Sequence, residues 1–92
     1  MGKVYTSGIS TAFTQSSSDV RLTVNIGFVP SIADPAYFLA AVKCNASHPY
    51  YPNSWIQPPM WAVAGSSIVM TWLSQDESYF DQCVWYAERP LA

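Results

Sequence analysis

The chain has 92 residues, of which 50% are hydrophobic, 15% aromatic and only 11% charged. This length suits one domain, residues 1–92. The net charge of −2 excludes a nucleic-acid-binding face, and the lack of a run of about 18 apolar residues excludes membrane insertion. Because soluble domains are nearer to about 25% charged, we expect apolar surface here to be buried against other copies of the chain.

The N-terminal third predicts one strong strand. Residues 1–8 are expected to form an extended arm, and residues 9–14 a weaker strand. Residues 15–19 form a polar run that predicts a turn, so the weak strand should make a hairpin with residues 20–28. That last segment alternates without interruption, which predicts a strand with one buried face, namely Val20, Leu22, Val24, Ile26 and Phe28.

Residues 36–44 allow two interpretations. Asp34 and Pro35 form a good helix N-cap and first turn, which would start one short helix around residues 35–44. The segment that follows is apolar on every side, which fits a buried strand equally well. The strand is favoured because the neighbouring elements are strands.

Residues 48–60 form a long connection that contains four prolines, so regular ladder hydrogen bonds are not expected there. The segment and its end are rich in aromatic side chains, and we interpret Tyr50, Tyr51, Trp55 and Trp61 as contact residues. A protein partner is the favoured ligand of these side chains. Stacking on a sugar ring and simple capping of the core are the alternatives.

The C-terminal third predicts two more strands, residues 68–73 and 79–88, joined by a polar turn into a second hairpin. One face of the last strand would carry Cys83, Trp85 and Ala87, and the other Phe80 and Val84. The predicted fold is all-β, a compact antiparallel β-sandwich or a partly open barrel.

Residues that support catalysis are scarce. The chain has one histidine and no Cys-x-x-Cys pair or phosphate loop, so we expect no enzyme activity, metal site or cofactor. Cys44 with His48 is the one conceivable nucleophile and base, but the connection offers nothing to orient the imidazole. Cys44 and Cys83 are expected to be reduced and buried, with a disulfide between them as the alternative.

The pattern Val84-Trp85-Tyr86-Ala87 closes an order of elements, across residues 20–90, that resembles small β-sandwich modules at the tips of bacteriophage tail fibres. It is similar, more loosely, to H-type lectin domains. The resemblance implies a homotrimer or larger assembly in a virion, with other virion proteins and surface carbohydrate as partners. The length fits a decoration, collar or baseplate protein better than a fibre tip, and no sugar-binding residue of the lectins is carried over.

Overall fold

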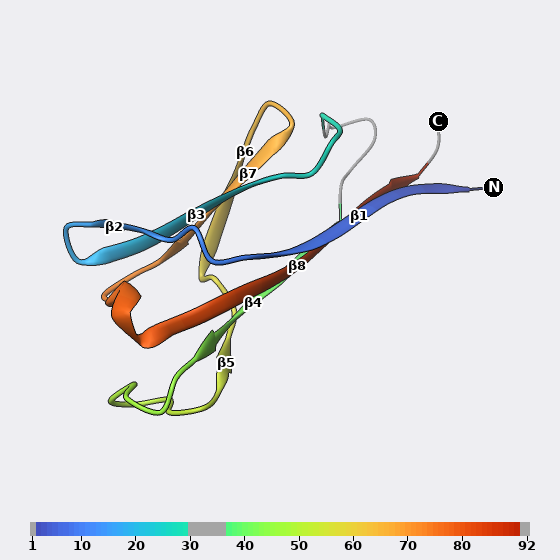
Figure 1. Ribbon diagram of the computed structural model, residues 1–92. Helices are drawn as coiled ribbons and strands as arrows, with labels where there is room; N and C mark the ends of the chain where they lie inside the picture. The colour runs from blue at the N-terminus through green and yellow to red at the C-terminus, as the bar shows by residue number, and fades with distance from the viewer. Residues whose placement is uncertain (1, 30–36, 91–92) are drawn as a thin grey trace.

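The computed structural model describes residues 2–29 and 37–90, which form a sandwich of two antiparallel four-stranded sheets (Figure 1). The expected all-β class is therefore confirmed. The first sheet has the order β1-β8-β4-β5, and the second has the order β2-β3-β7-β6. The strands are β1 (Lys3–Ser10), β2 (Thr14–Ser16), β3 (Asp19–Asn25), β4 (Tyr37–Cys44), β5 (Trp55–Ile56), β6 (Met60–Ala64), β7 (Ser67–Trp72) and β8 (Phe80–Pro90).

The core lies between the two sheets and follows the alternation in the sequence. Val20, Leu22 and Val24 of β3 point inward and are buried, as are Ile68, Met70 and Trp72 of β7. They pack against the inward residues of β4 and β8, so each sheet contributes one apolar layer to the core. The buried faces expected for residues 20–28 and 68–73 are confirmed, although the first strand ends at Asn25.

The segment with two interpretations is a strand. β4 pairs with β8 on one side and with β5 on the other, which makes it a central strand of the first sheet. Its inward residues Phe38 and Val42 are buried in the core, whereas Tyr37 and Leu39 on the other side are apolar although about half exposed. The cap at Asp34 and Pro35 lies outside the described residues.

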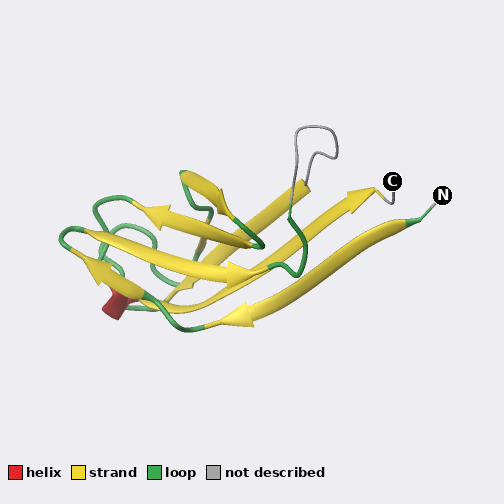
Figure 2. Cartoon of the chain, turned by 90° about the horizontal axis from the view of Figure 1, so that it is seen from above, coloured by secondary structure: helices red, strands yellow, loops and turns green. Residues whose placement is uncertain are grey.

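The first hairpin is shorter than expected. β2 and β3 pair through a tight turn at Ser17 and Ser18, with Ser17 at a φ of 58°. The hairpin therefore begins at Thr14, whereas residues 9 and 10 belong to β1. Residues 3–8 form a strand rather than a free arm, because β1 pairs with β8 along its whole length (Figure 2). Gly8 lies against the Trp85 ring, where a Cβ would stand 2.8 Å from Cζ2.

The second predicted hairpin is wrong. β7 pairs with β3 and β6, while β8 pairs with β1 and β4, so the connection between them crosses from one sheet to the other. A single 3₁₀ turn, η1 (Glu77–Tyr79), redirects the chain there (Figure 2, red). Asp76 caps it by accepting a hydrogen bond from Ser78 N, which holds the pKa of the Asp76 carboxyl below its usual range. Because β7 and β8 lie in different sheets, their apolar faces pack against each other across the core.

β8 contains a β-bulge, so its buried residues differ from those that strict alternation predicts. Lys43 pairs with Gln82, but the next residue, Cys44, pairs with Phe80, so Asp81 is the extra residue. An extra residue switches the face on which the following side chains lie. Phe80 and Cys83 are therefore both buried, although strict alternation assigns them to opposite faces.

Candidate functional site

The outer face of the first sheet carries large apolar side chains in place of the polar ones that a solvated face needs. Tyr5 and Ile9 of β1 are 68% and 66% exposed, and Tyr37 and Leu39 of β4 are about half exposed. We call outer face A the set of outward residues Tyr5, Ser7, Ile9, Tyr37, Leu39, Ala41, Lys43, Trp55, Gln82, Val84, Tyr86 and Glu88. Such a contiguous apolar area marks an interaction surface.

One end of outer face A combines tyrosines with a carboxylate. Tyr5 and Tyr37 lie on either side of Glu88, one from each neighbouring strand. The hydroxyl of Tyr86, whose ring stacks on Tyr5 at 6.3 Å, donates to Glu88 Oε2, and Lys3 Nζ lies 3.3 Å from Oε1. The hydrogen bond from Tyr86 is the main cause that lowers the pKa of Glu88, and the same bond raises the pKa of Tyr86. Glu88 is therefore a persistent negative charge.

The opposite end of outer face A is basic. Lys43 lies between Gln82 of β8 and Trp55 of β5 in the last row of the sheet. Its ammonium donates to the carbonyl of Cys44 at 3.2 Å, and its side chain is only partly exposed. Outer face A thus carries the Glu88 carboxylate, paired with Lys3, at one end and Lys43 at the other, with mostly apolar side chains in the rows between them.

The outer face of the second sheet is different in kind. The outward residues of β3 are Arg21, Thr23 and Asn25, and they pair with Thr71, Val69 and Ser67 of β7. All of these but Val69 are polar, and the edge strand β6 adds the exposed apolar residues Met60, Ala62 and Ala64 to the same face. Outer face A exposes larger apolar side chains over three strands, whereas the exposed apolar residues of the second sheet are confined to β6, so outer face A is the stronger candidate for an interaction surface.

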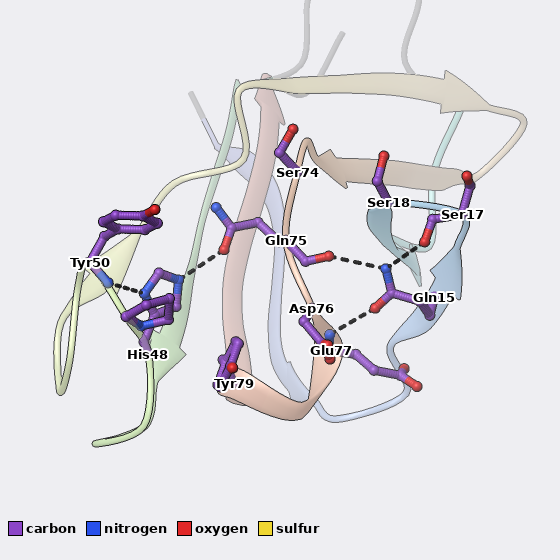
Figure 3. A pocket seen from close by; sticks show the side chains of 11 residues that line it. Gln15, Ser17, Ser18, His48, Tyr50, Ser74, Gln75, Asp76, Glu77 and Tyr79 are labelled. Atoms are coloured by element: carbon purple, nitrogen blue, oxygen red, sulfur yellow. Dashed lines mark hydrogen bonds between the residues drawn. The ribbon is translucent and has the colours of Figure 1, made fainter.

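A second feature is a cleft of about 560 Å³ at the end of the sandwich where the chain crosses between sheets (Figure 3). Its walls come from the β2–β3 turn, the segment before η1 and the start of the proline-rich connection. The side chains that line it include Tyr50, which is 80% exposed, and the two acidic residues Asp76 and Glu77. A volume of this size falls in the range of small-molecule sites.

Most polar atoms around this cleft already hold the fold together. His48 is 3% exposed, and its Nδ1 accepts hydrogen bonds from the backbone N–H of Tyr50 and Tyr51 at 3.2 and 2.9 Å. The ring is therefore neutral with its proton on Nε2, which donates to Gln75 Oε1 at 2.8 Å (Figure 3). Gln15 links the β2–β3 turn to the same segment through Gln75 O and Glu77 N.

The structure separates the four aromatic residues expected to make contacts. Tyr50 lines the cleft, and Tyr51 packs against His48 with ring centroids 5.5 Å apart. Trp55 belongs to outer face A. Trp61 is on the inner side of β6 and packs against Phe38 at 5.3 Å. Sequence reasoning missed most of outer face A, because β4 and β8 have apolar residues on both of their faces.

Both cysteines are free and fully buried. Burial raises the pKa of the Cys83 thiol to about 11, and it also raises that of Cys44. His48 uses both ring nitrogens elsewhere, so Cys44 has neither the thiolate character nor the base that a nucleophile needs.

No cluster of three metal-ligating side chains exists within the described residues, and none of the helical structure described is long and apolar enough to cross a membrane. No family model, curated protein or solved structure matches the chain.

Proposed function

We propose that this chain is a non-enzymatic assembly protein that buries outer face A against a second copy of itself. The observation that carries the proposal is the exposure of Tyr5, Ile9, Tyr37, Leu39 and Trp55 together on one sheet face. Burying such side chains releases about 25 cal/mol for each Å² of apolar surface removed from water.

A second copy suits outer face A in size and in shape. β1 and β4 have eight residues each, and β8 lies between them. Three strands of this length cover roughly 400 Å² in plan from each copy. Protruding tyrosine and tryptophan side chains add to this, so two copies reach the roughly 1,000 Å² that a specific interface needs. A single face of this kind packs most simply on itself around a two-fold axis, which favours a dimer over the trimer implied by the resemblance.

The place of this assembly is proposed only on the resemblance of residues 20–90, with their closing pattern at residues 84–87, to tail-fibre modules. On that basis the dimer is a structural or attachment component of a bacteriophage particle, located in the virion and in contact with other virion proteins. Co-purification of the chain with intact particles supports this setting, and its absence from washed particles contradicts it.

Leu39→Glu tests the proposed interface. Leu39 lies in the middle of outer face A beside Tyr86 and is about half exposed, so a charge there leaves folding intact but must be desolvated on association. We expect the association constant, measured by sedimentation equilibrium, to fall at least about tenfold.

Thr23→Glu is the matched control, because it adds the same charge to the exposed face of the second sheet. It should leave association unchanged. The assignment of the interface to outer face A is contradicted if the association constant falls equally in both variants or falls in neither.

The cleft supports a second candidate function, binding of a saccharide. Tyr50 offers an exposed ring for stacking, and Asp76 and Glu77 provide carboxylates that accept hydrogen bonds from sugar hydroxyls. A glycan array probed with the unmodified chain and with Tyr50→Ala tests it. Signals that the variant loses support the function, whereas a blank array for the unmodified chain excludes the saccharides displayed.

A further inference from the structure

We propose that the two copies pack with their two-fold axis across the strands, so that Lys43 of each copy binds Glu88 of the other between Tyr37 and Tyr86. This inference rests on the proposed function and specifies how the two copies of the proposed dimer are aligned. It follows from the order of side chains on outer face A.

The register of the first sheet places these side chains in four rows. Glu88 stands in the first row between Tyr5 and Tyr37, and Lys43 stands in the last row beside Gln82. The rows are two residues apart, so the first and last are separated by about 20 Å along the strands. A two-fold axis across the strands reverses the order of the rows in the second copy. It thereby places the last row of one copy over the first row of the other, with β4 stacked on β4.

The first row is built to receive an ammonium group. The Glu88 carboxylate has about four lone-pair sites, of which Tyr86 and Lys3 use one each, so a further donor finds room. Tyr37 lies opposite Glu88 on β4 and Tyr86 lies two residues before it on β8, so both aromatic side chains are neighbours of the carboxylate, and aromatic rings attract cations. Lys43 is suited to this role because its present acceptor is a backbone carbonyl and not a carboxylate.

The alternative axis, parallel to the strands, lacks this complementarity. It keeps each row opposite itself and exchanges the positions of β4 and β8. Lys43 would then face Gln82, and Glu88 would face Tyr37, so Lys43 would lose water without gaining an opposite charge. Desolvation of an unpaired charge costs far more than desolvation of a paired one. The axis across the strands is therefore the one that the charges favour.

Charge exchange between the two positions tests this register. Lys43→Glu and Glu88→Lys should each weaken association at least about tenfold, because each brings like charges together across the interface. The double variant restores opposite charges in reversed order, and we expect its association constant to return to within about threefold of the unmodified chain. Circular dichroism of each variant checks that the sandwich is folded.

Neutral substitutions provide a second cycle that introduces no new repulsion with Lys3. If the contact exists, Lys43→Met and Glu88→Gln lose the same interaction, so the double variant associates no more weakly than the weaker single variant. Losses that add fully, or an exchange variant that is not restored, overturn the register while dimerisation stands. A monomeric unmodified chain overturns the proposed function itself.

Discussion

Replacement of Trp72 by alanine is expected to lower the free energy of unfolding by about 4 kcal/mol, within the range for a large buried aromatic side chain. Trp72 is 1% exposed and makes edge-to-face contacts with Phe13 and Phe80, at ring distances of 6.3 and 5.7 Å. Its Nε1–H also donates to Ile56 O at 3.4 Å, which ties the second sheet to β5 of the first. The substitution removes the largest side chain of the core and leaves a cavity that its neighbours cannot fill.

Urea denaturation followed by circular dichroism measures this loss. A domain of this size has about 5–14 kcal/mol of stability in total, so the variant should unfold at a much lower denaturant concentration. Trp72→Phe is the matched control, since it keeps a ring but not the indole N–H, and it should lose clearly less. A Trp72→Ala midpoint close to that of the unmodified chain would contradict the position of Trp72 in the core.

Replacement of His48 by alanine is expected to cost about 3 kcal/mol, although His48 is a polar residue in a connection. The imidazole satisfies two backbone N–H groups and Gln75 from a site that is 3% exposed. Its ring also packs between Tyr51 and Tyr79, at 5.5 and 5.7 Å. Deletion leaves the two backbone N–H groups without an acceptor and Gln75 Oε1 without a donor, and an unsatisfied buried group costs about 1–3 kcal/mol in addition to the lost packing.

Tyr50→Ala serves as the control for the histidine variant. Tyr50 donates to His48 through its backbone, and its side chain is 80% exposed, so truncation should leave stability within about 0.5 kcal/mol of the unmodified chain. Thermal unfolding of the two variants separates the outcomes. If His48→Ala and Tyr50→Ala unfold at the same temperature, the imidazole is not the group that holds the connection in place.

The burial of single strands and the turn of the first hairpin could be predicted from the sequence, but the sheet to which each strand belongs could not. The alternation from Val20 to Phe28 and from Ile68 to Trp72 has a period of two, which identifies the buried side chains directly. A polar turn between two strands looks the same whether it closes a hairpin or crosses between sheets. The crossing at residues 73–79 depends on contacts with β3 and β4, which lie far away in the sequence.

Outer face A was hidden from sequence reasoning for a related reason. β4 and β8 have apolar residues on both faces, as in Leu39 beside Phe38, so their alternation does not reveal which side is exposed. That side becomes known only once Phe38 and Val42 are placed in the core. The low charge of the chain indicated that apolar surface would be exposed, and the aromatic connection drew attention to Tyr50 and Tyr51, which lie elsewhere.

The central claim is that outer face A is buried in a pair of chains. Sedimentation equilibrium of the unmodified chain over a range of concentrations tests it most directly. We expect the mass to rise from that of one chain, 10.2 kDa, to twice that value as the concentration increases. A mass that stays at 10.2 kDa up to high micromolar concentration would contradict the claim, because an apolar face of this size would then remain in contact with water.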